Sequence, residues 1–200
     1  MKIGVLGGTF DPVHLGHLQI AEEARVSLDL SEVILIPAGQ PAIKSSPLIT
    51  SAESRLEMVR LSVADRPYFR VSASEVERAG PSYTVDTLAQ LRKEYGSEDN
   101  LYFILGWDSL TQLPDWREPA RIIEMCRLVG VPRPGSPRPD LEVLETRVPG
   151  ISQRVVLLEK PLIDISASAV REKVARGVSI DHLVPGPVAE YISDHKLYTE

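Results

Sequence analysis

The feature that most constrains this chain is a run of eleven residues, GGTFDPVHLGH, which extends from Gly7 to His17. Lys2 to Leu6, just before it, reads as a short buried strand, and the residues after Pro12 read as the beginning of a helix. His14 and His17 are three positions apart, so they fall on the same side of the first helical turn. The run therefore predicts a strand-to-helix junction that carries two imidazoles.

This junction is a candidate phosphate site, because Gly7 and Gly8 are expected to expose peptide N–H groups there. A glycine turn that leads into a helix directs unpaired N–H groups and the positive end of the helix dipole at an anion. The two commonest phosphate loops, G-x-x-x-x-G-K-S/T and G-x-G-x-x-G, do not occur in the chain. A turn with two solvent-facing histidines and no ligand is the structural alternative.

Strands and helices alternate along the rest of the chain. Apolar runs predict strands at 33–36, 69–72, 101–105, 128–131 and 155–158, and helical periodicity predicts helices at 15–28, 84–95, 121–125 and 168–176. A further helix is expected to begin after a capping box in which Thr50 is the cap and Glu53 is the third helical residue. This alternation predicts an α/β fold with a doubly wound parallel sheet, in which ligands lie at the carboxyl ends of the strands.

Composition narrows the class of protein. With 200 residues and 43% hydrophobic content the chain can bury one good core, so residues 1–200 are expected to form a single domain. A net charge of −6 and a pI near 5.3 argue against a nucleic-acid partner. Cys126 is the only cysteine, and no apolar stretch approaches the roughly 18 residues of a membrane span. We therefore expect a soluble, cytoplasmic protein with no membrane partner.

Two segments in the first half of the chain add polar residues near expected strand and helix ends. Residues 37–44, PAGQPAIK, form a rigid loop that delivers Lys44, a cation able to meet a phosphate. An ordinary surface lysine is the alternative there. Ser82, Tyr83 and Thr84 gather hydroxyls at a helix start, where they can hold a ring or a carboxylate, although plain N-capping by Ser82 or Thr84 explains them equally well.

Further candidates follow strands in the second half. Asp108 comes just after Gly106 at a strand end and suits a ribose hydroxyl, and the indole of Trp116 can stack on a flat ring. A core tryptophan is the usual alternative for an indole. Arg133 lies between two prolines after the next strand, where a guanidinium can contact a phosphate. Each of these signals is weak when taken alone.

The segment of residues 165–171, ISASAVR, opens the last helix expected from the pattern. Ile165 follows a predicted strand, Ser166 and Ser168 supply hydroxyls at the helix start, and Arg171 lies one turn in. These residues are either a second phosphate-binding helix start or two ordinary capping serines.

The H-x-G-H pattern of residues 14–17 resembles the signature of the nucleotidylyltransferase superfamily. Taken together and in order, the GGTFDPVHLGH run, GPSYTVDTL at 80–88 and the later segments resemble the bacterial nicotinate-nucleotide adenylyltransferases over nearly the whole chain. The chain departs from that family in having Ala42-Ile43 where a histidine or another bulky residue usually precedes the lysine. It also lacks one hydroxyl of the ISSTxIR-like segment, and the loop at 132–139 is rich in proline.

The resemblance implies a Rossmann-like nucleotidylyltransferase (HUP-like) fold and a reaction. In that reaction ATP and nicotinate mononucleotide give nicotinate adenine dinucleotide and pyrophosphate, with Mg²⁺ carried by ATP and no metal site of protein residues, in NAD biosynthesis. The expected catalytic residues are His14, His17 and Arg171. The expected ATP-binding residues are Gly7, Gly8, Thr9, Phe10, His14, His17, Gly106, Asp108, Ile165, Ser166, Ser168 and Arg171. The expected mononucleotide-binding residues are Lys44, Ser82, Tyr83, Thr84, Trp116 and Arg133.

Two other functions fit parts of the sequence. A phosphopantetheine or cytidylyl transferase of the same superfamily would share the H-x-G-H and serine–arginine segments, but has no reason to carry the motifs at 82–86 and 113–116. A nucleotide-sensing module without turnover is the alternative from another class, and the intact His14, His17 and Arg171 argue against it. A homo-oligomer is compatible with the sequence.

Overall fold

Six parallel strands form the central sheet of the computed structural model, which describes residues 1–41, 49–96 and 100–199. The strand order is β4-β2-β1-β6-β7-β8, and every neighbouring pair is parallel. The order reverses between β1 and β6, which is the crevice where doubly wound sheets bind ligands. The predicted fold class is therefore confirmed. The strands are β1 (Lys2–Gly8), β2 (Glu32–Pro37), β4 (Phe69–Val71), β6 (Asn100–Gly106), β7 (Arg127–Val131) and β8 (Val155–Leu157).

The two faces of the sheet bury separate apolar clusters, because successive strand residues point to opposite sides. Val33 and Leu35 of β2 belong to one cluster, whereas Ile34 and Ile36 belong to the other. The first cluster packs α1 (Leu15–Leu28), α2 (Ala52–Val63), α7 (Ala167–Ala175) and α8 (Gly186–Asp194). The second packs α3 (Thr84–Tyr95), α4 (Trp107–Gln112), α5 (Pro119–Met125) and α6 (Leu141–Arg147).

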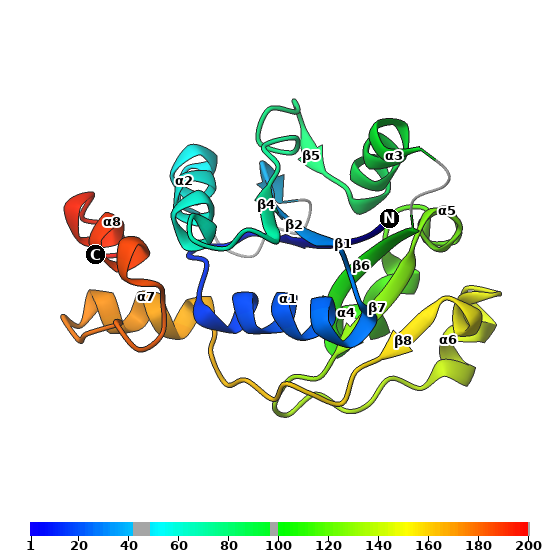
Figure 1. Cartoon of the computed structure of the whole chain (residues 1–200). Coiled ribbons are helices and arrows are strands. Elements are labelled where there is room, and N and C mark those ends of the chain that lie inside the picture. The colour runs from blue at the N-terminus through cyan, green and yellow to red at the C-terminus, as the bar shows by residue number, and fades with distance from the viewer. Residues whose placement is uncertain (42–48, 97–99, 200) are drawn as a thin grey trace.

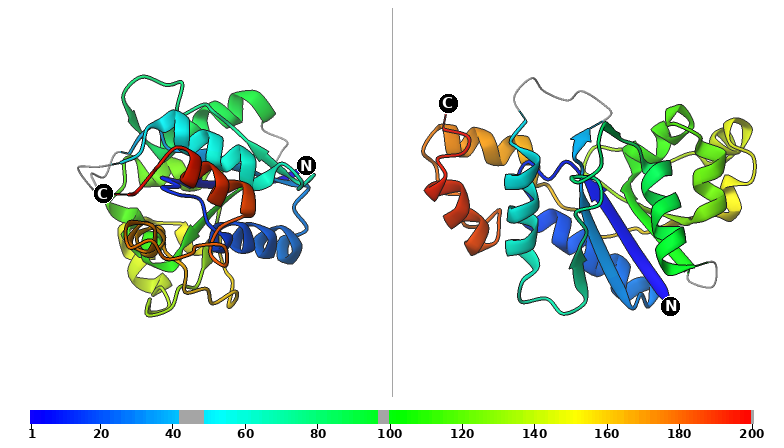
Figure 2. Two further views of the ribbon diagram at one scale, coloured as in Figure 1. Left: turned by 90° about the vertical axis from the view of Figure 1, so that its left-hand side faces the viewer. Right: turned by 90° about the horizontal axis from the view of Figure 1, so that it is seen from above.

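The C-terminal helices extend one end of the molecule. Figure 1 shows α7 and α8 beside α1 and α2, with β8 and α6 at the opposite end. Both views of Figure 2 show α8 lying along α2, and those two helices are in contact. A second, two-stranded parallel sheet joins β3 (Gln40–Pro41) to β5 (Pro81–Ser82), and 3-10 turns cover Leu113–Asp115 and Ile151–Gln153.

Several predicted boundaries are wrong in detail. Gly7 and Gly8 do not form a turn; they continue β1 and pair with Ile36 and Pro37 of β2. The helix start at α2 is also shifted. Its cap is Ser51, whose hydroxyl accepts from the Ser54 N–H at 3.1 Å, so the predicted capping box of Thr50 and Glu53 is wrong.

Other helix ends differ by a residue or are new. The last predicted helix begins at Ala167 after the cap Ser166, and not at Ser168. Neither Ser82 nor Thr84 caps α3, because its N-cap is Tyr83 and no side chain caps it. The sequence analysis does not predict α4, α6 or α8. Within the described ranges, we find no helix long and apolar enough to cross a membrane.

Candidate active site

Two adjoining cavities open near the carboxyl ends of the central strands. The larger, of about 440 Å³, is here named the Thr84 pocket. The smaller, of about 200 Å³, is named the histidine pocket. Gly7, Phe103 and Trp116 line both cavities, so the two are joined at the end of β1. The Thr84 pocket is also lined by Gly8, Thr9, Ala38, Glu75, Ser82, Tyr83, Thr84 and Arg117. The histidine pocket is also lined by His14, His17, Gly106, Asp108, Arg133 and Ile165.

The two histidines lie on the same side at the start of α1, as their spacing predicts, and their rings stack on one another. Their ring centroids are 3.6 Å apart and the rings are nearly parallel, at 22°. His14 is the N-cap residue, and its backbone N–H donates to Nδ1 of His17 at 3.2 Å. Because Nδ1 of His17 accepts this bond, the neutral ring carries its proton on Nε2. His17 is thereby left with an N–H donor at its other nitrogen.

Burial keeps both imidazoles neutral near pH 7. Desolvation, followed by the nearby charge of Arg133, lowers the pKa of His14 to about 4. Desolvation also lowers the pKa of His17 well below its ordinary value, with His14 and Arg133 contributing. The Nδ1 atom of His14 is buried without a hydrogen-bond partner in the described structure. The pair therefore meets a ligand as neutral donors and not as two cations.

Gly16, between the histidines, is needed for the position of the His14 ring. A Cβ at this residue would lie 3.0 Å from His14 Nδ1 and 3.2 Å from Cγ2 of Ile163, closer than side chains normally pack. A side chain at residue 16 would push the ring out of its stack on His17. A small residue at position 16 therefore keeps the His14 ring in place, in addition to leaving space for a nucleotide.

Phe10 lies under the histidines, although the sequence analysis predicts it as a lining residue of the nucleotide cleft. Its ring is buried, contacts the edge of His17 at a centroid distance of 4.9 Å, and covers Gly8. It lines neither cavity. Its φ of 51° lies in the left-handed region that a bulky residue seldom adopts. The structure therefore gives Phe10 a supporting position below the imidazoles.

Arg55 is a buried residue of the site that the sequence analysis misses. Its side chain lies inside α2's packed face and is only 1% exposed. The guanidinium donates to the carbonyl oxygens of Thr9 at 2.7 Å, Ala38 at 2.6 Å and Gly39 at 2.9 Å, and Nε donates to that of Thr50 at 2.9 Å. One side chain thus ties together the loops that follow β1 and β2. The sequence offered one signal for its burial. Arg55 lies four residues before the inward-facing Val59, so both fall on the same face of the helix.

Asp11 joins the signature run to the C-terminal part of the chain. Its carboxylate accepts from the Tyr198 hydroxyl at 2.6 Å and from the Thr50 N–H at 3.3 Å. Its backbone carbonyl accepts from Arg171 at 2.6 Å. Arg171 is therefore held beside the signature run, although it lines neither cavity. Tyr198 is a second residue of the site that the sequence analysis misses.

The serines near Arg171 act as helix-start residues. The Ser166 hydroxyl accepts from the Ala169 N–H at 3.2 Å, which is the capping alternative named above. The Ser168 hydroxyl accepts from Arg171 at 3.3 Å. Neither serine lines the two cavities, whereas Ile165 lines the histidine pocket.

Arg133 pairs with Asp108, which changes its expected location. The guanidinium of Arg133 and the carboxylate of Asp108 are 3.7 Å apart, and both residues line the histidine pocket. The sequence analysis groups Arg133 with the mononucleotide, but its side chain lies with the residues predicted for ATP. A Cβ at Gly106 would overlap the Asp108 carboxylate, so a side chain there would force Asp108 to move.

The structure brings together four of the residues expected to bind the mononucleotide, because the Thr84 pocket is lined by Ser82, Tyr83, Thr84 and Trp116. Their binding role stays a prediction. The Ser82 hydroxyl accepts from the Gly39 N–H at 3.0 Å, which links β5 to the loop after β2. Trp116 is half-buried and meets Phe103 edge to face, with centroids 6.2 Å apart. Lys44, the remaining candidate, lies outside the described residues.

A buried carboxylate also lines the Thr84 pocket. Glu75 accepts a hydrogen bond from the Thr87 hydroxyl at 2.5 Å. Burial raises the pKa of Glu75, although hydrogen bonds from Thr87 and Ser82 and the charge of Arg78 act against this rise. The sequence analysis does not select Glu75, because nothing local distinguishes it from a surface glutamate.

Comparison with known proteins shows the family of this chain. Residues 5–173 match the family described as cytidylyltransferase-like. A probable nicotinate-nucleotide adenylyltransferase of Dehalococcoides mccartyi (strain CBDB1) is 50% identical over 198 residues, which cover 99% of this chain and 97% of the relative. One from Roseiflexus sp. (strain RS-1) is 49% identical over 98% of this chain and 97% of the relative.

Solved structures share the fold at low sequence identity. Plasmodium falciparum nicotinic acid mononucleotide adenylyltransferase complexed with NaAD is similar with a TM-score of 0.78 at 18% identity, over 98% of this chain and 97% of that one. The same enzyme complexed with APC has a TM-score of 0.76, over 98% and 96% of the two chains.

Proposed function

Because the chain belongs to the nicotinate-nucleotide adenylyltransferase family, we propose that it transfers the adenylyl group of ATP to nicotinate mononucleotide. The products are nicotinate adenine dinucleotide and pyrophosphate, and the reaction belongs to NAD biosynthesis. The observation that carries the proposal is the pair of adjoining cavities, one lined by stacked histidines and one by Trp116 and the start of α3. Two substrates in these cavities would meet at Gly7, at the end of β1.

The chemistry requires alignment more than proton transfer. A phosphate oxygen of the mononucleotide attacks the α-phosphorus of ATP, and the bond from that phosphorus to the bridging oxygen breaks as pyrophosphate leaves. The attacking phosphate is already an anion at neutral pH, so no general base is needed. The protein has to hold two like-charged reactants in line and stabilise the charge on the departing group.

We assign the polyphosphate to the histidine pocket and its surroundings. The Nε2–H of His17 is a preorganised donor, because Nδ1 of the same ring is occupied by the His14 N–H. His14 stacks on it, and Arg171 lies beside the same loop through the Asp11 carbonyl, so it can take the β- and γ-phosphates together with Ser166 and Ser168. Asp108 is the candidate for the ATP ribose.

The nicotinate ring is assigned to the Thr84 pocket. Trp116 offers a face or edge to a flat ring, and the start of α3 offers the Thr84 hydroxyl and the first backbone N–H groups of the helix. The positive end of the helix dipole there favours a carboxylate over a neutral carboxamide. We therefore expect the acid mononucleotide to be preferred by at least about 10-fold, from one or two charge-assisted hydrogen bonds.

Mg²⁺ is proposed to arrive with ATP. Within the described residues no three His, Cys, Asp or Glu side chains are grouped so that they could hold a metal ion. Magnesium commonly keeps several waters and binds substrate phosphates, so a protein cage is not required. When bound, the ion would neutralise charge on the phosphates, and the residues above would orient them.

Three broader proposals accompany this function. Residues 1–200 act as one domain, since one sheet supplies both cavities. The enzyme works in the cytoplasm on small substrates, without nucleic acid or membrane. Formation of a homo-oligomer stays a prediction to be measured by sedimentation.

A coupled assay for pyrophosphate tests the function directly. Purified protein with ATP and nicotinate mononucleotide should release pyrophosphate and form the dinucleotide, and nicotinamide mononucleotide should react more slowly. His17→Ala should lower kcat by about 10²- to 10³-fold, because it removes a preorganised donor. His182→Ala is the matched control, since His182 is an exposed histidine outside both cavities. Wild-type protein that binds ATP without releasing pyrophosphate would refute the proposal.

A further inference from the structure

Arg117 brings a positive charge to the wall of the Thr84 pocket. It follows Trp116 directly, and its guanidinium lies over the ring of Tyr83, with the central carbon 4.7 Å from the ring centroid. Tyr83 is the N-cap residue of α3, so the cation lies next to the helix start at Thr84. A guanidinium over an aromatic face is held in place without using its N–H donors.

The carboxylates near Arg117 leave those donors largely free. Its nitrogens are 3.7 Å from Asp86 and 3.6 Å from Glu118, which are ion-pair distances too long for hydrogen bonds. Both acidic side chains are about 40% exposed, so water screens each pair. The guanidinium can therefore turn its N–H groups toward a ligand without breaking a short hydrogen bond to either neighbour.

The other charged residues that line this pocket are acidic. They are Glu75, which is buried, and Asp115, which is paired with Arg147 at 2.6 Å. Among the lining residues that the structure describes, Arg117 is the one cation. A carboxylate on a bound ring would meet the field of Glu75, and that repulsion has to be offset from within the pocket.

We propose that Arg117 is a specificity-determining residue, which favours a carboxylate over a carboxamide on the pyridine ring of the mononucleotide. The inference rests on the proposed function and adds to it a charged group beyond the start of α3. The guanidinium donates to the carboxylate and balances Glu75, whereas a neutral carboxamide gains little from the charge. Arg117 has no role among the site residues predicted from the sequence.

Arg121, on α5, provides a matched control four residues along the chain. Its side chain is as exposed as that of Arg117, 51% against 52%, and it pairs with the same Glu118 at 3.1 Å. It does not line the Thr84 pocket. Removal of either arginine changes the net charge equally, but only Arg117 adjoins the proposed ring site.

The test is the ratio of affinities for the two mononucleotides. Quenching of tryptophan fluorescence gives Kd for nicotinate and for nicotinamide mononucleotide without turnover. The value of kcat/KM with ATP gives the same preference during the reaction. Arg117→Gln should reduce the preference for the acid about 10-fold, the loss of one charge-assisted bond. Arg117→Lys should recover part of it, and Arg121→Gln should leave it within 2-fold of wild type.

An unchanged preference in Arg117→Gln, or an equal loss in Arg121→Gln, would overturn the proposal. A wild-type protein that prefers the acid in binding but forms no dinucleotide would refute the proposed function and not the role of Arg117. A wild-type protein that binds the two mononucleotides equally would refute the role of Arg117, even where adenylyl transfer is observed.

Discussion

Replacement of Arg55 by methionine should destabilise the protein and damage the Thr84 pocket together. Methionine has a similar length but no donor, so four carbonyl oxygens lose their partner, those of Thr9, Ala38, Gly39 and Thr50. The four residues are half-buried and not enclosed in the core. The cost per unpaired carbonyl is then at the low end, about 1 kcal/mol, which gives a loss of about 4 kcal/mol in the free energy of unfolding.

That loss leaves a folded protein to examine, since domains are typically stable by about 5–15 kcal/mol. For a chain of this size, 4 kcal/mol corresponds to a fall in Tm of about 10 °C. Thr9 and Ala38 line the Thr84 pocket, so KM for the mononucleotide should rise more than KM for ATP. Urea unfolding and steady-state kinetics on the same preparation measure both effects.

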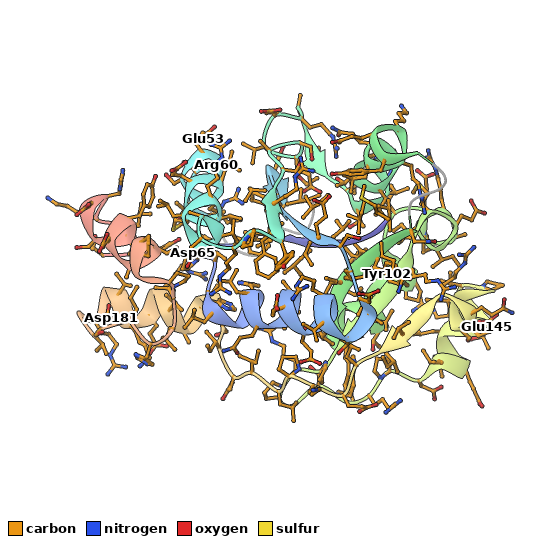
Figure 3. The ribbon with its side chains drawn as sticks, viewed as in Figure 1. Glu53, Arg60, Asp65, Tyr102, Glu145 and Asp181 are labelled. Atoms are coloured by element: carbon orange, nitrogen blue, oxygen red, sulfur yellow. The ribbon has the colours of Figure 1, made fainter. Side chains whose placement is uncertain are left out.

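Arg60→Met is the control on the same helix. Figure 3 shows Arg60 with Glu53 on the outer side of α2, and its pair with Glu57 is long, at 3.6 Å, and half-exposed. This variant should lose less than about 0.5 kcal/mol. Arg55 would not hold the loops after β1 and β2 together if Arg55→Met were as stable as Arg60→Met. The same conclusion would follow if Arg55→Met raised both KM values equally.

Three further predictions concern the histidine pocket and Arg171 beside it. Because the pKa of His14 falls from 6.5 to about 4 on folding, the unfolded chain binds an extra proton between these pH values. The free energy of unfolding should therefore drop by about 3 kcal/mol as pH falls from 6.5 to 4, and urea titration of His14→Gln should show less of this drop. Gly16→Ala should displace the His14 ring, lower the free energy of unfolding by about 1–3 kcal/mol and lower kcat. An unchanged Tm and kcat would show that residue 16 does not need to be glycine. Arg171→Lys should lower kcat/KM for ATP at least about 10-fold, because an ammonium cannot bind two phosphate oxygens as a guanidinium does. Kinetics with varied ATP measure this change. An unchanged KM and kcat would show that Arg171 is not part of the site.

Local patterns in the sequence determined most of the elements. β1, β2 and β6 are short apolar runs that end at glycine or proline, and β7 is one that ends just before Pro132. α1 and α3 carry apolar residues on a helical period. These signals depend on neighbours along the chain, so the α/β class and the position of both histidines on one side of the helix start could be predicted from them. The shift of the α2 cap from Thr50 to Ser51 shows their limit, because both residues have a hydroxyl that can cap a helix.

Packing also separates residues that residue type alone does not. Trp107 and Trp116 carry the same indole, and Trp116 was selected through the family resemblance. Trp107 is buried and donates to the Gly130 carbonyl at 3.3 Å, whereas Trp116 lines both cavities. Likewise, Arg133 was placed beside Asp108 by the adjacency of β6 and β7, which strand patterns do not specify.

The residues that the sequence analysis missed act over long distances. Arg55 reaches a carbonyl 46 positions away and Tyr198 reaches a carboxylate 187 positions away, and neither contact leaves a local pattern. Arg117 is set beside Tyr83 only when α3 and the turn before α5 come together in the folded chain. The sequence by itself determined which strands and helices form and where phosphate chemistry lies. Tertiary structure alone decided which polar side chains are buried, paired or left facing the cavities, because burial and pairing depend on segments that meet only when the sheet is assembled.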